Sequence, residues 1–461
     1  MPEPTPERLS ARQVLDLVTD PGTFAELPHP ARQSPPDGPL AWQGYEASRA
    51  RAAGRTGEEE SVVVGTARVE GTAAVLIAFE FGFLGGSLGE RTGDRLEAAY
   101  VHARAHRLPV VPLVATGGSR MQEGMLALSQ LQRVARQSAL TREAGLAQIA
   151  VLRDPTTGGG WATLGAGADV ILALPGAQVG FAGSRVRPPD ADPAAYTAEA
   201  QLAAGSVDAV VPMSGLKSRL GLWLRLLTSP AATPADPPAA LGGTGLPATG
   251  GEAVRRARAP QRPRAQAYLD AYFTRRVALV GDRCGGADPD GMLCGFGERD
   301  GRTVAFAAQT GTATRPAGYR TAARLIRLAD RLDIPVLTLV DTPGAANDAD
   351  AERQGAGAAI AELFGEVAAA RMPITTLVIG EGGSGGALAL AAPGNTWATP
   401  DSYFSVIAPE LAAAILKRPP EEVEPTADQL RIRPQDLVEL GVVRGIVGRS
   451  PDGLAAPAPT G

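Results

Sequence analysis

The chain has 461 residues, which is enough for two or three domains with sizeable cores. Its formal net charge of −5 gives no sign of a nucleic-acid-binding surface, and its two cysteines exclude a four-thiolate zinc site or a disulfide framework. The first residues lack a basic segment followed by an apolar run, and no apolar stretch is long enough to span a membrane. We therefore expect a cytoplasmic protein that contacts neither nucleic acid nor membrane.

The first half of the chain predicts an N-terminal extension, residues 1–40, and a domain, residues 41–228. Within this domain the expected elements are a helix, an apolar strand, a second helix, a second apolar strand and a glycine-rich turn, at residues 95–107, 109–118, 121–140, 147–154 and 154–160. Apolar strands that alternate with helices are typical of an α/β sheet with covered faces, and ligands bind at the ends of such strands.

The second half begins with residues 229–260, which are rich in Pro, Gly, Ala and Thr without an apolar period and predict a linker. A second domain is expected at 261–450 and a tail at 451–461. This domain repeats the order of helix, strand, helix, strand and glycine-rich turn, at residues 321–333, 334–344, 355–370, 374–380 and 380–386.

An internal duplication relates the two domains. At one constant offset of 226 residues, Pro109–Gly118 aligns with Pro335–Gly344, the helix before each strand aligns with its counterpart, and Gly159-Gly160 aligns with Gly385-Gly386. A single offset that holds for three separate features indicates a duplicated unit, too long to be a solenoid repeat. Tight helix–sheet packing explains one such glycine turn readily, but it explains two equivalent turns less well.

The two glycine turns predict backbone hydrogen-bond donors. Glycine lets a ligand approach the chain, and the first N–H groups of a helix lack partners, so they bind a phosphate or a developing oxyanion. Neither turn is a Walker phosphate loop, because neither has the required Lys. The second turn matches the dinucleotide pattern through Gly380, Gly382 and Gly385, but the only acidic residue near the required distance is Asp401.

Side-chain acids and bases are sparse near these turns. The histidines are His29, His102 and His106, and none lies in a glycine motif. Ser87 and Ser384 each occupy a G-x-S-x-G pattern, but no His follows Ser384 and only the two helix histidines follow Ser87. The sequence therefore disfavours a serine hydrolase and predicts chemistry that relies on backbone donors without a side-chain base.

Distinct motifs follow one another in each half. The first half contains FLGGSLG, GGSRMQEG, DPTTGG and VGFAGSR at 83–89, 117–124, 154–159 and 179–185. The second half contains RPRA, GYR, DTPGA, GEGGSGGAL and YFSVIAPE at 262–265, 318–320, 341–345, 380–388 and 403–410. In this order the motifs resemble the β-type and then the α-type subunit of the acetyl-CoA carboxylase carboxyltransferase family, fused in one chain.

The resemblance implies an α/β fold with two crotonase-like (ClpP/crotonase) ββα-superhelix domains in tandem. It also implies carboxyl transfer from carboxybiotin to the α-carbon of an acyl-CoA, most simply acetyl-CoA. Biotin would be carried on a separate biotin carboxyl carrier protein that a biotin carboxylase loads, and the enzyme would be a homodimer or a higher homo-oligomer. No metal, and in particular no zinc, is expected.

The resemblance also implies the site residues. The backbone amides of two glycine pairs would form oxyanion holes: Gly158, Gly159, Gly385 and Gly386. The residues expected to contact substrate are Gly85, Gly86, Gly117, Gly118, Arg120, Trp161, Phe181 and Gly344.

Three departures from the family pattern keep other functions open. The four-cysteine zinc ribbon of many β subunits is absent, Thr310–Arg315 lacks the usual lysines, and Gly160-Trp161 replaces a Val and a small hydroxyl residue. There are two alternatives to a carboxyltransferase, because fold alone does not fix function. One is a decarboxylase acting on malonyl-type thioesters, and the other is a non-catalytic partner in a carboxylase complex. We expect Trp161 either to narrow the acyl pocket or to pack in the core.

Overall fold

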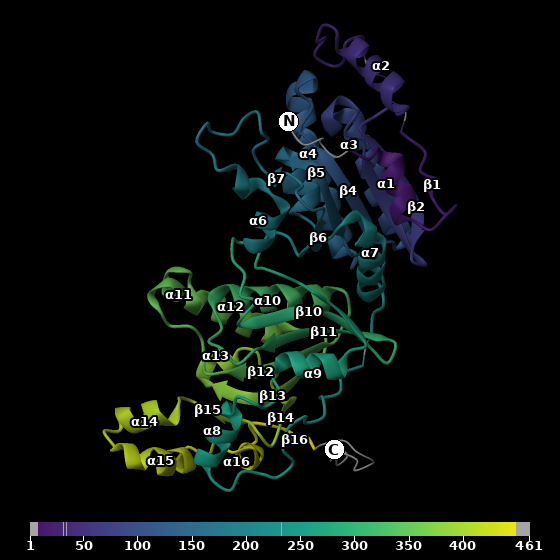
Figure 1. The fold of residues 1–461 in the computed structure, drawn as a ribbon. Coiled ribbons are helices and arrows are strands. Elements are labelled where there is room, and N and C mark those ends of the chain that lie inside the picture. The colour runs from purple at the N-terminus through teal and green to yellow at the C-terminus, as the bar shows by residue number, and fades with distance from the viewer. Residues whose placement is uncertain (1–7, 31, 34, 232, 449–461) are drawn as a thin grey trace. The chain divides into compact units, whose positions relative to one another are not determined.

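The computed structural model describes residues 8–30, 32–33, 35–231 and 233–448, and the chain divides into two compact units. Unit 1 contains residues up to Ser229 together with Arg283–Gly286, and unit 2 contains the remainder from Pro230 onward (Figure 1). Each unit is built around one eight-stranded mixed sheet. Two sheets in tandem confirm the predicted duplication and the predicted α/β class.

The sheet of unit 1 has the strand order β1-β2-β3-β4-β5-β6-β8, and β7 also pairs with β5. The strands β1 to β3 are antiparallel, and the remaining pairs are parallel. The strand bounds are β1 Ala25–Glu26, β2 Val62–Val69, β3 Thr72–Phe79, β4 Val110–Thr116, β5 Ile149–Thr157, β6 Val170–Ala173, β7 Val179–Gly180 and β8 Ala209–Val210.

The sheet of unit 2 repeats this plan, with the order β9-β10-β11-β12-β13-β14-β16 and with β15 paired to β13. Again the first pairs are antiparallel and the others parallel. The strand bounds are β9 Arg275–Ala278, β10 Met292–Arg299, β11 Arg302–Gln309, β12 Val336–Thr342, β13 Ile374–Gly383, β14 Thr396–Ala398, β15 Tyr403–Ser405 and β16 Gly445–Ile446.

Helices connect the parallel strands, as a parallel sheet requires. The helices of unit 1 are α1 Ala11–Val18, α2 Tyr45–Thr56, α3 Glu90–His106, α4 Gly124–Glu143, α5 Gly158–Gly160, α6 Ala198–Ala203 and α7 Met213–Leu227, and a π-helical turn, Trp161–Gly165, follows α5. Those of unit 2 are α8 Gly250–Arg258, α9 Ala265–Tyr272, α10 Pro316–Arg331, α11 Ala349–Arg353, α12 Ala356–Ala369, α13 Ser384–Leu388, α14 Pro409–Ile415, α15 Val423–Gln429 and α16 Pro434–Glu439. Within the described residues, none of these helices combines the length and apolar character needed to cross a membrane.

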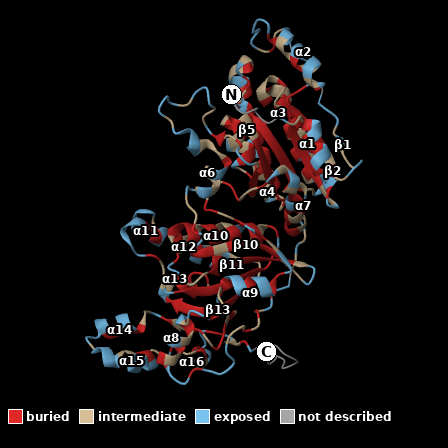
Figure 2. Cartoon of the chain, viewed as in Figure 1, coloured by how far each residue is buried: buried red, intermediate tan, exposed pale blue. Residues whose placement is uncertain are grey.

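The central strands carry the cores of both units. Every residue of β4 and β12 is buried, and the strands of both sheets are mostly buried (Figure 2). A parallel strand covered on both faces reads as a continuous apolar run, which is why these two strands were predictable within two residues. Each sheet then forks at the same place, because β5 pairs first with β6 and then with β7, while β13 pairs first with β14 and then with β15. A glycine turn follows each fork.

Two of the predicted segments outside the domains contain folded elements. The N-terminal extension is part of unit 1, because α1 buries Val14 and Val18 and β1 pairs with β2. The predicted linker is partly folded: Gly250–Arg258 forms α8, which buries Ala253 and Ala257. The buried face of this helix consists mainly of small residues set among arginines, so the composition of the segment concealed it. The predicted tail, 451–461, lies outside the described residues.

Candidate functional site

The first glycine turn begins where β5 ends. Gly158 adopts a left-handed backbone conformation, φ +63°, and a Cβ there would lie 3.2 Å from the Cα of Gly118, so only glycine fits without strain. Its N–H donates to the carbonyl oxygen of Phe181, at 3.0 Å. A ligand that used Gly158 as an oxyanion donor would have to displace this bond, and the role of Gly158 stays a prediction.

Gly159 and Gly160 provide the available donors of this turn. They occupy the second and third positions of α5, where backbone N–H groups have no partner within the helix. A Cβ on Gly159 would overlap the Leu131 side chain, and a Cβ on Gly160 would overlap the Thr116 side chain. Neither position has room for a side chain unless these neighbours move. Gly159 belongs to the predicted pair Gly158-Gly159, and Gly160 is the counterpart of Gly386 at the offset of 226.

The predicted glycines of the first half converge on this turn. The N–H of Gly117 donates to the carbonyl oxygen of Gly85 at 2.9 Å, and a Cβ on Gly86 would overlap the carbonyl of Ala115. Gly118 in turn packs against Gly158. Three motifs that are far apart in the sequence therefore meet at the carboxyl ends of β4 and β5.

Arg120, a predicted substrate contact, is buried in unit 1. Its side chain is only 1% exposed and forms an ion pair with the fully buried Glu60. It also donates to the carbonyl oxygen of Ser87 at 2.7 Å and to the Tyr45 hydroxyl at 3.2 Å. Burial favours protonation of Glu60, but the Arg120 guanidinium outweighs this effect and lowers the pKa of Glu60 to about 2. Arg120 thus braces the loop that carries Gly86, and its contact with substrate stays a prediction.

Trp161 and Phe181 differ in exposure. The half-buried Trp161 indole packs on the core cluster formed by β5 and β6, and a Cβ on Gly165 would overlap its ring. Phe181 is 74% exposed beside the first turn, and its carbonyl oxygen accepts from Gly158. The structure therefore places Phe181 at a surface open to a ligand, while it favours the packing interpretation for Trp161.

The second glycine turn repeats the geometry of the first. Ser384 occupies the position of Gly158 at the offset of 226 and has the same left-handed conformation, φ +56°, which is rare for a residue with a side chain. Gly385 and Gly386 then form the second and third positions of α13. The predicted donor pair of the second half thus has the same placement as Gly159-Gly160 in the first half.

Contacts behind the second turn hold Gly386 in place. Its carbonyl oxygen accepts from Gln309 Nε2 and from the Tyr319 hydroxyl, both at 3.1 Å. A Cβ on Gly386 would overlap the backbone nitrogen of Ala345 and would lie 2.7 Å from the Tyr319 oxygen. Gly344, another predicted site residue, lies beside the carbonyl of Gly383 in the same turn. These contacts leave no room for a side chain at Gly386.

The three histidines belong to unit 1 and lie outside the segment that forms its glycine turn. His102 and His106 stack on α3 with ring centroids 3.9 Å apart, and His29 pairs with Glu26. Partial burial, together with the neighbouring His106, lowers the pKa of His102. Each turn can therefore stabilise negative charge with backbone N–H groups, whereas proton transfer would need a group supplied by a reactant.

Each unit has a mixed sheet in which one strand, β5 or β13, leads into a left-handed residue and a glycine pair. This arrangement is that of the crotonase-like class. The same fold occurs in the solved structure of transcarboxylase 12S with methylmalonyl-coenzyme A bound, at a TM-score of 0.78 and 20% identity over 96% of this chain and 87% of that chain. It also occurs in a single-chain, multi-domain long-chain acyl-CoA carboxylase, at a TM-score of 0.73 and 21% identity over 96% of this chain and 45% of that one. These likenesses confirm the predicted tandem crotonase-like fold.

Family comparisons specify the class further. The family model "Carboxyl transferase domain" matches residues 36–216, and the model "Acetyl co-enzyme A carboxylase carboxyltransferase-like" matches residues 249–457. The chain is 40% identical to acetyl-coenzyme A carboxylase carboxyl transferase subunits beta/alpha of Salinispora arenicola, over 95% of this chain and 82% of that protein. It is 33% identical to a Mycobacterium tuberculosis protein named "Probable biotin-dependent acyl-coenzyme A carboxylase beta3 subunit", over 98% and 91% of the two chains.

The chain belongs to the acetyl-CoA carboxylase carboxyltransferase family, with its β-type and α-type halves fused. Its function is that of a carboxyltransferase component of a biotin-dependent acyl-CoA carboxylase. The predicted family, fold and enzyme class are confirmed.

Proposed function

We propose that this carboxyltransferase moves the carboxyl group from carboxybiotin, held on a separate carrier protein, to acetyl-CoA. The observation that carries the proposal is the equivalence of the two turns: Gly158 and Ser384 are both left-handed, and a glycine pair with available N–H groups follows each. The names of the beta/alpha relatives support acetyl-CoA as the acyl substrate.

The reaction needs two sites for negative charge, and the chain offers two. One site would hold the thioester carbonyl oxygen as the α-carbon loses its proton, and the other would hold the ureido oxygen of biotin. Carboxybiotin supplies the CO₂ and, once it has lost that CO₂, the base for the α-proton. The N–H groups of Gly159 and Gly160 would serve one oxygen, and those of Gly385 and Gly386 the other. Backbone donors fixed before the reaction stabilise such charge without reorganisation.

The fit of biotin to this chain rests on the chemistry of these donors. A ureido oxygen is an acceptor that gains negative charge, and orphan N–H groups at a helix start are the matching donors. Since neither glycine turn contains a histidine, we infer that the base is the biotin that the chain positions.

We further propose that the working unit is a homodimer or a higher homo-oligomer that works with a biotin carboxyl carrier protein and a biotin carboxylase. Several large apolar side chains are exposed in each unit, and exposed apolar surface of this kind can be covered by a partner. They are Met121, Met125, Phe181 and Val186 in unit 1, and Leu388, Val406, Leu411, Ile415 and Leu416 in unit 2.

Half-reactions test the two-site proposal. A valine at Gly159 would clash with Leu131 at the first turn, and a valine at Gly386 would clash with Ala345 at the second turn. Each variant should therefore displace the donors of one turn and lower kcat for carboxyl transfer by about 10²–10³-fold. Decarboxylation of free carboxybiotin reports on the biotin site, and exchange of the α-proton of acetyl-CoA reports on the thioester site. The two variants should fail in different half-reactions while circular dichroism and thermal melting stay near wild type. A well-folded variant with full carboxyl transfer would show that its turn is structural.

A further inference from the structure

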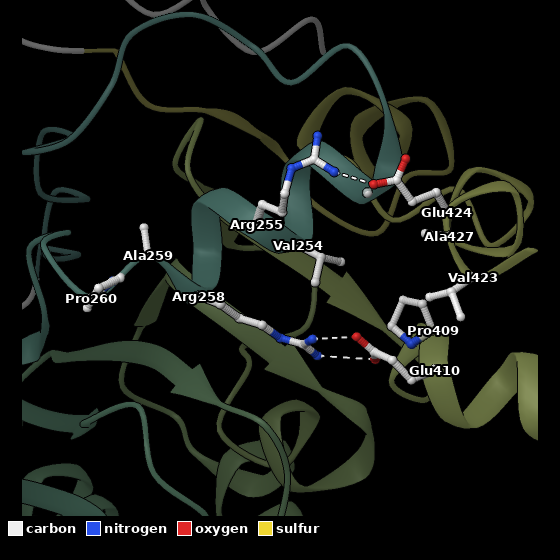
Figure 3. Close-up of a pocket in the computed structure, with 11 residues that line it drawn as sticks. Val254, Arg255, Arg258, Ala259, Pro260, Pro409, Glu410, Val423, Glu424 and Ala427 are labelled. Atoms are coloured by element: carbon white, nitrogen blue, oxygen red, sulfur yellow. Dashed lines mark hydrogen bonds and ion pairs between the residues drawn. The ribbon is translucent and has the colours of Figure 1, made fainter. Parts of the chain in front are cut away.

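Arg258, the last residue of α8, joins three polar groups of unit 2. Its Nε donates to a carboxylate oxygen of Glu381 at 2.7 Å, and its terminal nitrogens contact the Glu410 carboxylate at 2.6 and 3.4 Å. The Tyr403 hydroxyl donates to Glu381 at 2.8 Å and lies 3.4 Å from the guanidinium. Figure 3 shows Arg258 reaching across a cavity of about 390 Å³ to Glu410 at the start of α14.

This network is more than a pair of surface charges. The Glu381 side chain is 12% exposed and the Tyr403 ring is buried, so the contacts of Arg258 with β13 are shielded from water. Partly buried ion pairs with several hydrogen bonds hold their geometry better than exposed pairs, which contribute little. The planar guanidinium also serves two carboxylates at once, which the single ammonium of a lysine cannot reproduce.

Glu381 connects the network to the second glycine turn. It lies in β13 four residues before Gly385, and its backbone pairs with that of Tyr403 in β15. The N–H of Glu381 donates to Asp341 at 3.1 Å, and Asp341 is itself paired with the buried Arg262 at 2.5 Å. The end of β13 is therefore held on its backbone by Asp341 and on its side chain by Arg258.

Glu410 connects the same guanidinium to α14. It is the second residue of that helix, and α14 carries the exposed Leu411 and Ile415. The contact with Glu410 thus ties α14 to the strand that leads into the donors at Gly385 and Gly386. Donors of this kind must be held within about 0.5 Å of their productive positions.

We propose that Arg258 is a positioning residue, which sets the second glycine turn and α14 relative to each other and thereby keeps the donors at Gly385 and Gly386 in register for catalysis. Arg258 touches neither reactant in this role. The proposal rests on the proposed function for its kinetic consequence, but its structural consequence, a tightly held turn, can be measured without catalysis.

Arg255 provides the matched control. It lies one turn earlier on α8 and lines the same cavity, where it pairs with Glu424 (Figure 3). Both partners of that pair are more than 60% exposed, and neither contacts β13 through a hydrogen bond shown by the structure. Arg255→Met therefore removes an arginine from the cavity wall without touching the network.

The experiment compares Arg258→Met, Arg258→Lys and Arg255→Met in the full-length chain. Arg258→Met should lower kcat for carboxyl transfer by about 10²-fold, the cost of a misplacement of about 1 Å, while KM for acetyl-CoA changes much less. Arg258→Lys should recover only part of this loss, because a lysine keeps the positive charge but lacks the planar set of donors with which the guanidinium binds two carboxylates. A rescue experiment uses two further variants, Arg258→Ala and Arg255→Ala. Added methylguanidinium, which is small enough for the cavity, should restore the activity of Arg258→Ala in a saturable way and should not change the activity of Arg255→Ala.

Amide hydrogen exchange separates this proposal from the proposed function. The segment 381–388 should exchange faster in Arg258→Met than in wild type or Arg255→Met, whether or not the wild type transfers carboxyl groups. Wild-type protein without transfer would refute the proposed function alone. Unchanged exchange in Arg258→Met, or equal losses of kcat in Arg258→Met and Arg255→Met, would overturn the positioning role. If Arg258→Met does not fold, Glu381→Gln and Glu410→Gln carry the same test from the other side of the network.

Discussion

Replacing Gly386 by alanine tests whether the second glycine turn acts through the placement of its backbone. The added Cβ would lie 2.7 Å from the Tyr319 oxygen and closer still to the nitrogen of Ala345. Ordinary contact needs about 3.5 Å, so the turn must move by about 1 Å. A displacement of that size costs about 10²-fold in rate when it misplaces a catalytic group, and overpacking costs about 1–3 kcal/mol of stability. We therefore expect a folded, less stable variant with kcat reduced about 10²-fold.

The assay measures carboxyl transfer to acetyl-CoA at a temperature well below the melting transition of the variant. Gly365→Ala is the control, because Gly365 lies in α12 and a Cβ there meets nothing within 4 Å. That change should leave kcat unaltered and raise stability by about 0.5–1 kcal/mol. Full kcat in a well-folded Gly386→Ala variant would refute the argument that this backbone position supports the donors.

Four further outcomes are expected. Glu60→Gln leaves the buried Arg120 without its charged partner, so urea unfolding should show a loss of about 3–5 kcal/mol, and a loss near zero would contradict the bracing role. The fold lowers the pKa of Glu60 to about 2, so the stability that Glu60 contributes should be complete above its unfolded pKa near 4.5 and should be lost as the pH falls toward 2. The free energies of unfolding of wild type and Glu60→Gln, measured by urea titration, should therefore converge near pH 2. Because the Trp161 indole packs on a buried cluster, Trp161→Ser should lower the thermal stability and leave the ratio of kcat/KM for longer acyl-CoAs to that for acetyl-CoA unchanged, whereas a shift of this ratio toward longer acyl-CoAs would show that the indole narrows the acyl pocket. Light scattering should show a homodimer or larger species at assay concentration, and an active monomer would refute the oligomeric proposal.

The sequence predicted the duplicated architecture because its strongest signals are local. The buried parallel strands β4 and β12 read as apolar runs, and their bounds lie 226 residues apart, which is the offset found from the sequence. The same offset pairs Gly159-Gly160 with Gly385-Gly386, so the offset alone does not include Gly158 in the first donor pair. The family resemblance shifted the first pair by one residue, and only the hydrogen bond from Gly158 to Phe181 shows the difference.

Long-range contacts account for the features that the sequence did not reveal. Arg120 lies in a motif shared with the family, yet its partner Glu60 comes from a segment 60 residues earlier, so sequence spacing could not reveal a buried ion pair. Similarly, Arg258 falls in a segment that composition assigned to a linker, while its partners Glu381 and Glu410 lie more than 100 residues away. Pairings of this kind follow from the sheet topology, which brings the ends of distant strands together.

The most direct test of the central claim follows labelled carboxylate from a carboxylated biotin carrier to acetyl-CoA and a panel of longer acyl-CoAs, with and without avidin. We expect labelled malonyl-CoA from acetyl-CoA in the presence of the purified protein, and complete inhibition when avidin covers the biotin. Release of CO₂ from malonyl-CoA that avidin does not affect, with no transfer from the carrier, would contradict it and would instead support a thioester decarboxylase.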